Sequence, residues 1–454
     1  MASSSFQSIA TLTEVERIAR LFPSFRDFVD DALFHPQWGY YSTGRVRFGE
    51  GGHYDTFPLT LSPLFGCMLA QYAYRFWRRA GQPAHFELCE LGAGNGQLCL
   101  DVLVRVAAGD RAGGAWRSFA KSFRYRIIER SPALIARQRQ QLGPLATGVT
   151  WTRADLAEEN LADLPLEACG LVFANEVLDC LGHHKVVPSS KGSPGVTFVV
   201  PLIAGGDGAP RGLVRGLDDA GHAVPRTALA RVFSNERWRQ RVTYREVVLP
   251  LCIVPDLEAF MRRHYPEFFV AAKRLRPYFA CPAIERLISN TARLYRRSEM
   301  LWIDYGEGRE LHLTTAERQR IFAGPPRSGA TVYRAPGFDD ITFLVDFSVV
   351  ARSAQQAGLR VKFYGAQGEL ARRSRVALDR QARDLILRSR TLGWMLALMG
   401  LGPEREWRHT GLTWSKQSGR GGSLRADVNR AVAEFLGTRK SNFKLMILAS
   451  GGDA

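Results

Sequence analysis

The sequence is poor in cysteine, and the spacing of its cysteines is not typical of disulfide pairs or metal ligands. Seven of the 454 residues are cysteine, and no two of them form a C-x-x-C pair. An odd and scattered set of this kind argues against a disulfide framework and against a bound zinc ion, so no metal site is expected. It is typical of reduced thiols in a cytosol-like compartment.

Long apolar runs are also missing. No run approaches the roughly 20 residues that a helix needs to span a bilayer, so no membrane span is expected. The first residues, Met-Ala-Ser-Ser-Ser-Phe, show neither a charged region followed by an apolar stretch nor an arginine-rich leader. These features favour a cytoplasmic location, with the mitochondrial matrix as the alternative.

Lysine is scarce, although the chain is strongly basic. Only eight of the 61 basic residues are lysine, and the formal net charge is +17. Such a charge suggests an anionic partner such as RNA. A GC-rich genome that encodes arginine in place of lysine explains it equally simply. The arginines are spread along the chain and form no single block, which favours the second interpretation over an RNA partner.

Apolar strands alternate with helices in the first half of the chain. The strands expected at 86–91, 125–129 and 171–174 predict an α/β fold with a doubly wound, mainly parallel sheet. About 115 residues then precede the next core strand at 300–303, which is far longer than an ordinary connection. We therefore expect an inserted cap domain there, and further strands at 341–347, 360–364 and 443–448. The expected parts are an α-helical N-terminal segment with a substrate loop (1–82), the first part of the α/β core (83–182), the cap (183–297), and the remaining strands with C-terminal helices (298–454).

A glycine-rich turn follows the first of these strands. Gly92, Gly94 and Gly96 come directly after the strand that contains Glu90, and a helix begins next. A dinucleotide-binding fingerprint needs G-x-G-x-x-G, but its sixth position is Gln97 here. The G-x-G-x-G spacing after an acid is instead typical of S-adenosylmethionine (SAM) methyltransferases, so a nicotinamide-dependent dehydrogenase ranks last.

Each residue of this region has an expected task in holding SAM. Gly92 and Gly94 lack a Cβ atom and let the backbone approach the cofactor closely. Amides at the start of the helix face the methionine carboxylate. Glu90 would hold the cofactor's ammonium group, and Glu129, which ends the next strand, would accept the ribose hydroxyls; the alternative for Glu129 is a charge at a helix N-terminus. The expected cofactor-binding residues are Glu90, Gly92, Ala93, Gly94, Gly96, Glu129 and Asn175.

Carboxylates gather at the expected tip of the strand at 171–174. Glu176 and Asp179 follow Asn175 there, where the methyl group would be transferred. Carboxylates at this place suit a cationic or amine substrate, because they orient it and stabilise positive charge. The alternative is that they cap the following helix. His183 is a further candidate, as a catalytic base, although a histidine in a polar loop is more often only a surface residue.

Asp304 and Tyr305 end the strand expected at 300–303. In an open α/β sheet this end faces the same crevice as the glycine turn, so both are candidate substrate residues. The alternative for Asp304 is an aspartate that merely stabilises a turn.

Several motifs together resemble the MidA-like SAM-dependent methyltransferases, whose mitochondrial members methylate an arginine of a respiratory complex I subunit. The motifs are Pro36–Tyr41, Ser62–Gly66, Glu90–Gly96, Glu129–Pro132 with Leu134 and Gln138, Asn175–Glu176 with Asp179, Asp304–Gly306, Pro336–Thr342 and Val345–Phe347. The resemblance implies a class I methyltransferase fold, SAM as cofactor and a protein substrate, and it permits a homodimer.

The chain departs from the family's pattern on the substrate side. A family loop reads Gly-Asp-Phe followed by Thr, whereas Gly52 is followed here by His53 and Tyr54. We expect His53 to act in catalysis and Tyr54 to contact substrate. The family's Leu-Pro is here Leu181-Gly182. These changes favour methyl transfer to a different nitrogen or oxygen acceptor, either a protein arginine or a biosynthetic small molecule. The alternative is a non-catalytic assembly factor that docks RNA or a protein complex.

Overall fold

The computed structural model describes most of the chain and divides it into two compact units. The described residues are 12–48, 56–158, 167–189, 191–204, 210–215, 222–270, 276–308, 332–378, 424–437 and 443–450. The smaller unit comprises the described parts of 1–43, 182–282 and 314–343, and the larger unit those of 44–181, 283–313 and 344–454. The domain boundaries expected from the sequence stay a prediction.

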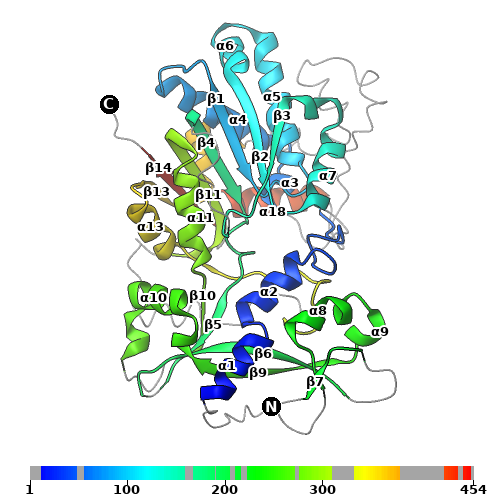
Figure 1. Ribbon diagram of the computed structural model, residues 1–454. Helices are drawn as coiled ribbons and strands as arrows, with labels where there is room; N and C mark the ends of the chain where they lie inside the picture. Colours follow the sequence, from blue (N-terminus) through cyan, green and yellow to red (C-terminus); the bar gives the residue numbers. More distant parts are fainter. Residues whose placement is uncertain are drawn as a thin grey trace. The chain divides into compact units, whose positions relative to one another are not determined.

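A mainly parallel sheet forms the centre of the larger unit (Figure 1). Its parallel strands are β1 (Phe86–Leu91), β2 (Phe123–Glu129), β3 (Val149–Arg153), β4 (Glu167–Asn175) and β11 (Tyr295–Glu307), in the spatial order β3-β2-β1-β4-β11. This order reverses direction after β1, as in a doubly wound fold, and places the carboxyl ends of β1, β4 and β11 at one edge. The predicted fold class is therefore confirmed.

Two later strands extend this sheet, and a third adds a short pair to it. β14 (Phe443–Ala449) lies antiparallel between β11 and β13 (Arg360–Ala366), and β12 (Val345–Asp346) pairs parallel with the end of β11. The prediction of a strand at 341–347 was wrong for most of this range, because the strand observed there covers only Val345–Asp346. Asp346 accepts the backbone N–H of Ser348 at 2.9 Å and caps helix α13 (Phe347–Gln356), so the strand ends after two residues.

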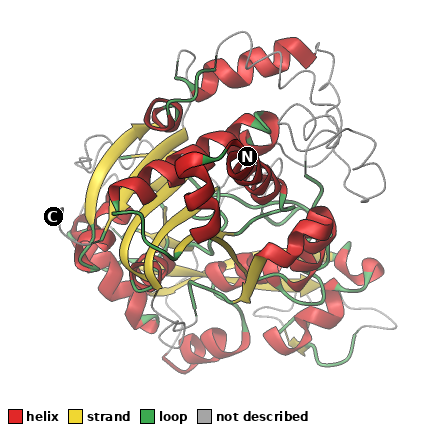
Figure 2. Cartoon of the chain, turned by 90° about the horizontal axis from the view of Figure 1, so that it is seen from above, coloured by secondary structure: helices red, strands yellow, loops and turns green. Residues whose placement is uncertain are grey.

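Helices flank the curved strands on both sides (Figure 2). Side chains from one face of the sheet, such as Phe86 and Leu88 of β1, join a large apolar core with α4 and α5. On the other face, α11 and α13 pack against each other. The helices of the larger unit are α3 (Phe57–Thr60), α4 (Leu64–Arg79), α5 (Gln97–Ala112), α6 (Gly114–Ser122), α7 (Pro132–Leu142), α11 (Ala283–Ala292), α13, α14 (Glu369–Ser374), α18 (Leu424–Phe435) and the 3₁₀ helix η1 (Gly143–Gly148).

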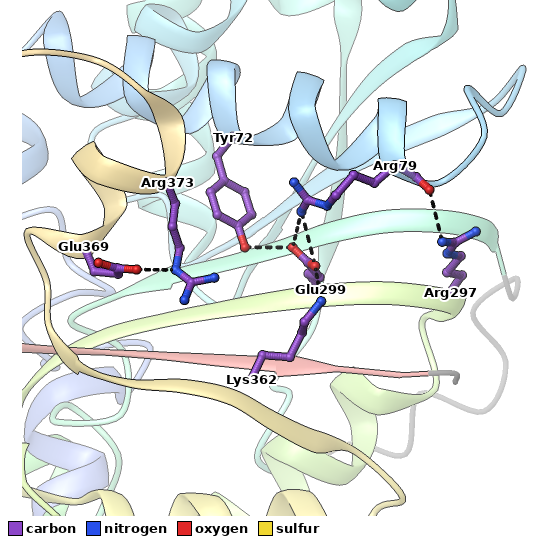
Figure 3. Close-up of polar contacts among 7 residues, drawn as sticks. All are labelled: Tyr72, Arg79, Arg297, Glu299, Lys362, Glu369 and Arg373. Atoms are coloured by element: carbon purple, nitrogen blue, oxygen red, sulfur yellow. Dashed lines mark hydrogen bonds and ion pairs between the residues drawn. The ribbon is translucent and has the colours of Figure 1, made fainter. Parts of the chain in front are cut away.

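A buried carboxylate ties helix α4 to strands β11 and β13 (Figure 3). The carboxylate of Glu299 in β11 accepts a hydrogen bond from the Tyr72 hydroxyl at 2.7 Å and another from the Lys362 ammonium at 3.0 Å. Arg79 forms an ion pair with the same carboxylate at 3.2 Å. Glu299 is only 3% exposed, so these cations and the tyrosine hydroxyl replace the water contacts that its carboxylate loses on burial.

The smaller unit is built around an antiparallel sheet. Its strands are β5 (His184–Val187), β6 (Gly195–Ile203), β7 (Val214–Arg215), β8 (His222–Ala223), β9 (Val242–Pro250) and β10 (Tyr278–Ala280), and β9 pairs with β6 along nine residues. Its helices are α1 (Leu12–Leu21), α2 (Phe25–Phe34), α8 (Arg226–Phe233), α9 (Glu236–Arg239), α10 (Pro255–His264) and the 3₁₀ helices η3 (Leu251–Ile253) and η4 (Pro266–Phe269). Phe28 packs edge-on against Tyr244 within its core. Among the described helices of the whole chain, none is long and apolar enough to cross a membrane.

Candidate functional site

The glycine turn after β1 has a backbone conformation that residues other than glycine rarely adopt. Gly92, Gly94 and Gly96 have φ angles of 63°, 53° and 86°, all in the left-handed region. A Cβ atom on Gly92 would lie 3.1 Å from the Val177 side chain, and one on Gly94 would lie 3.2 Å from the Phe48 ring. The turn is therefore restricted to glycine by its conformation, and neighbouring side chains crowd the positions that Cβ atoms would take.

Helix α5 begins directly after this turn. The backbone N–H of Gly96 bonds to the carbonyl oxygen of Ala93 at 2.8 Å, and that of Gln97 bonds to Oδ1 of Asn95 at 3.1 Å. These bonds close the turn tightly and bring the N-terminal end of a 16-residue helix to the carboxyl end of β1. A helix N-terminus carries partial positive charge and suits an anionic group such as a carboxylate.

Glu90 lies at the end of β1 and is 4% exposed. Its Oε2 atom accepts the hydroxyl hydrogen of Tyr125 at 2.7 Å. Burial raises the pKa of Glu90 to about 7; the tyrosine bond opposes this rise, and the charges of Glu129 and Asp101 add to it. A cationic group nearby would favour the ionised form.

Glu129 ends β2 and is equally buried. Its Oε1 atom accepts the backbone N–H of Ser131 at 2.9 Å, and its Oε2 atom accepts from Nε2 of Gln138 at 3.1 Å. Burial raises the pKa of Glu129 to about 7, and these hydrogen bonds lower it. Each carboxylate oxygen accepts one of these two bonds and keeps capacity for another donor, such as a ribose hydroxyl.

The end of β4 is held in an unusual conformation. Glu176 has a φ of 53°, which is uncommon for a residue other than glycine, and its backbone N–H bonds to the carbonyl oxygen of Ile303 at 2.9 Å. Asn175 donates from Nδ2 to Oε1 of Glu176 at 2.8 Å. The Oδ1 atom of Asn175 is buried and has no hydrogen-bond partner in the described part of the chain. Backbone of this kind is found preferentially at functional sites.

Two buried carboxylates follow at the same edge. Asp304 accepts the backbone N–H groups of Leu178 at 3.0 Å, Asp179 at 3.2 Å and Tyr305 at 2.8 Å. Burial raises its pKa well above the ordinary value, and the charges of Asp179 and Glu176 raise it further. Burial raises the pKa of Asp179 to about 6, against a hydrogen bond from the Tyr305 side chain. The Oδ1 atom of Asp179 is buried and lacks a partner among the residues that the structure describes.

The structure thus brings the predicted residues of the larger unit to the carboxyl ends of β1, β2, β4 and β11. His53 and Tyr54 lie outside the described residues. His183 belongs to the smaller unit, where its ring stacks on Phe343 with centroids 4.1 Å apart. The roles assigned to all of these residues stay predictions.

Two side chains next to Glu129 received no role from the sequence. Gln138, known only as part of a family motif, contacts both Glu129 and the glycine turn, and Trp151 of β3 contacts Gln138. The only local signal for Gln138 is its spacing: it lies seven residues after Ser131, so both are on the same face of α7. Nothing in the sequence shows that this face meets the glycine turn.

The residues at this edge fit SAM. The glycine turn has the left-handed backbone of a tight loop directly before a helix, and the start of α5 suits the methionine carboxylate. The buried acids Glu90 and Glu129 suit an ammonium group and a pair of hydroxyls, and the Oδ1 atom of Asn175, which has no partner among the described residues, needs a donor.

Comparison with known proteins agrees with this fit. Residues 68–365 match the family described as "Putative S-adenosyl-L-methionine-dependent methyltransferase". The chain belongs to this family. The membership confirms the methyltransferase class and the SAM cofactor that the sequence predicts, as well as the resemblance on which the prediction partly depends.

Similar sequences include mitochondrial arginine methyltransferases. The protein arginine methyltransferase NDUFAF7 homolog, mitochondrial, of Drosophila melanogaster is 31% identical over 180 residues, which are 35% of this chain and 37% of the relative. The NDUFAF7 protein of Xenopus tropicalis is 29% identical over 180 residues, 37% of this chain and 40% of the relative. The chain therefore spans about two fifths of the length of these curated relatives.

One solved structure is similar over almost the whole chain. It is a superfamily member from Burkholderia thailandensis, bound to S-adenosyl-homocysteine, with 20% sequence identity and a TM-score of 0.57. The match covers 98% of this chain and 95% of that protein. At this identity the similarity shows a shared fold.

Proposed function

We propose that this chain transfers a methyl group from SAM to a guanidinium nitrogen of an arginine side chain in a protein. The observation that carries the proposal is the pair of buried carboxylates, Asp179 and Asp304, at the sheet edge that also holds the glycine turn. The Drosophila and Xenopus relatives, which are named as protein arginine methyltransferases, support the same acceptor.

A guanidinium group would supply the hydrogen-bond donor and the positive charge that this pair of carboxylates lacks. Asp304 is engaged by three backbone N–H groups, whereas Asp179 keeps a buried oxygen without a partner in the described residues. Guanidinium carries a delocalised positive charge and five N–H donors in a planar fork. Its arrival would supply both a hydrogen bond and a counter-charge, which a buried carboxylate needs to stay ionised.

The roles of the residues follow from the proposed transfer. When bound, SAM supplies the methyl group as an electrophile on its sulfonium sulfur. Glu176 and Asp179 would orient the guanidinium. One of its nitrogens would form the new N–C bond as the bond between the sulfur and the methyl carbon breaks and leaves S-adenosylhomocysteine, and the proton of that nitrogen would pass to a carboxylate. Burial raises the pKa of Asp179 to about 6, so its carboxylate accepts a proton more readily than that of an ordinary aspartate. Asp304 fixes the backbone that carries Asp179.

Other predictions about acceptor and surroundings remain open to test. A biosynthetic small molecule with a basic nitrogen would suit the same carboxylates. No observation favours the non-catalytic assembly factor. The mitochondrial names of the relatives support the matrix as location over the cytoplasm. RNA binding and a homodimer stay predictions from the sequence.

Transfer of a labelled methyl group tests the proposal. The purified chain is incubated with SAM labelled in its methyl group and with a protein extract from cells that lack the gene. Acid hydrolysis and amino-acid analysis then identify the methylated residue. We expect the label in N-methylated arginine. Label in any other residue, or only in base-labile esters, contradicts the proposal.

Matched variants connect the transfer to the site. Asp179→Asn should lose at least nine tenths of the transfer while it still binds S-adenosylhomocysteine, because it removes a charge that faces the acceptor and not the cofactor. Asp110→Asn is the control, since this aspartate is exposed near the end of α5. Equal transfer by Asp179→Asn and the unchanged chain would exclude this carboxylate.

A further inference from the structure

Gln138 of α7 bridges the two parts of the expected cofactor site. Its Nε2 atom donates to the backbone carbonyl oxygen of Gly94 at 3.1 Å and to Oε2 of Glu129 at 3.1 Å. Gly94 lies in the turn after β1, and Glu129 ends β2. One side chain therefore links the turn expected to hold the methionine end to the acid expected to hold the ribose.

The orientation of this amide is fixed from the other side. Trp151 of β3 donates from Nε1 to Oε1 of Gln138 at 3.1 Å. An indole nitrogen can only donate, so the oxygen of the amide must face Trp151 and both hydrogens of Nε2 must face away from it. These two hydrogens have two acceptors, the Gly94 carbonyl and the Glu129 carboxylate. The side chain is fully buried, so water does not compete for these bonds.

We infer that Gln138 is a positioning residue for the cofactor: it holds the Glu129 carboxylate and the Gly94 carbonyl in the arrangement that receives the ribose hydroxyls. By occupying one side of Oε2, it leaves the remaining acceptor capacity of Glu129 for those hydroxyls. By bonding to the Gly94 carbonyl, it fixes the backbone of the turn relative to Glu129. The inference rests on the proposed function.

Packing and electrostatics point the same way. A Cβ atom on Gly96 would lie 3.2 Å from the Cα atom of Gln138, so the helix backbone at this residue lies directly against the turn. The hydrogen bond from Gln138 also lowers the pKa of Glu129 against the effect of burial, which favours the ionised acceptor.

The test compares two ligands on one variant. Gln138→Met keeps the length of the side chain and removes its hydrogen bonds, and Gln140→Met changes an exposed residue of the same helix as a control. Calorimetry measures the dissociation constants of S-adenosylhomocysteine and of its 2′-deoxy analogue. We expect Gln138→Met to weaken the binding of the parent ligand by about tenfold and that of the analogue by about threefold or less, because the part of the positioning that acts on the bond to the 2′-hydroxyl is lost only for the parent ligand.

Other outcomes separate the inference from the function on which it rests. An equal loss for both ligands, or no loss, overturns the positioning role. If the unchanged chain binds neither ligand, the proposed function fails. If Gln138→Met does not fold, Trp151→Phe is measured instead. This variant keeps Gln138 and removes the hydrogen bond that Trp151 donates to its amide oxygen. In Trp151→Phe we expect the affinity for the parent ligand to fall by about threefold and that for the analogue to fall less. An equal fall in affinity for both ligands overturns the inference.

Discussion

The carboxylate of Asp304 accepts the backbone N–H of Asp179 at 3.2 Å, while Asp179 keeps one buried carboxylate oxygen without a hydrogen-bond partner among the described residues. Asp304 thus fixes the backbone to which the Asp179 side chain is attached. The two residues are 125 positions apart and meet because β4 and β11 are neighbours in the sheet. This division of tasks leads to opposite expectations for substitutions at the two positions.

Asp304→Asn should destabilise the chain, whereas Asp179→Asn should not. The first places an amide group among three backbone donors, and we expect the free energy of unfolding to fall by about 1–3 kcal/mol. The second removes one charge from a buried pair of like charges, so stability should stay the same or rise. Urea denaturation followed by circular dichroism measures both. Equal destabilisation by the two substitutions would contradict the division of tasks.

Gly96→Ala should weaken the binding of S-adenosylhomocysteine by tenfold or more. Alanine at a φ of 86° costs about 1–2 kcal/mol, and its Cβ atom meets the helix backbone at Gln138. Gly81→Ala is the matched control, because Gly81 has a φ of 85° but open space around its Cβ position. Calorimetry on both variants separates backbone strain from damage to the turn. Similar affinities in the two variants would place the cofactor elsewhere.

Cofactor binding should release protons near pH 7. Burial raises the pKa values of both Glu90 and Glu129 to about 7, so each carboxyl is largely protonated at pH 6 and largely ionised at pH 8. An ammonium group and ribose hydroxyls need the ionised forms. The affinity for S-adenosylhomocysteine should therefore fall as the pH drops below 7, by up to about tenfold per pH unit for each group.

Calorimetry in two buffers of different ionisation enthalpy counts the released protons. Glu129→Gln should reduce both the proton release and the pH dependence, because it removes one of the two titrating groups. Binding that takes up protons at pH 6.5, or that does not depend on pH between 6 and 8, would rule out this arrangement of acids.

Glu299→Gln should destabilise the larger unit. The substitution removes the charge that Tyr72, Arg79 and Lys362 share (Figure 3). Because Arg79 and Lys362 are partly exposed and recover hydration, we expect a loss of about 2 kcal/mol rather than the larger cost of a fully buried pair. Glu258→Gln is the control: its i,i+4 pair with Arg262 is exposed, and its loss should cost less than about 0.5 kcal/mol. Urea denaturation compares the two, and equal losses would show that the Glu299 network adds nothing.

The glycine turn and its flanking elements were predictable because their signals are local. The strand at 86–91 has the bounds of β1, and the helix begins one residue after Gly96, as the turn geometry requires. The alternation of strands and helices gave the fold class in the same way. The strand expected at 341–347 failed because the capping side chain of Asp346 ends it, an effect that apolar spacing does not reveal.

The connections between distant residues were not predictable. Gln138 and Gly94 are 44 positions apart, and Glu299 and Tyr72 are 227 apart. A side chain's partner across a sheet depends on the register and packing of several elements, which one sequence does not contain. The positive φ of Glu176 likewise arises from the way the end of β4 pairs with β11, through Ile303, rather than from its own residue type.

The central claim is that Gly92–Gly96 and Glu129 hold an S-adenosyl cofactor, since every proposed role depends on it. Calorimetric titration of the purified, unmodified chain with S-adenosylhomocysteine tests it most directly. The account predicts saturable binding at one site per chain, with a dissociation constant in the micromolar range that rises at least tenfold in Gly96→Ala. The absence of saturable binding at millimolar ligand would contradict it.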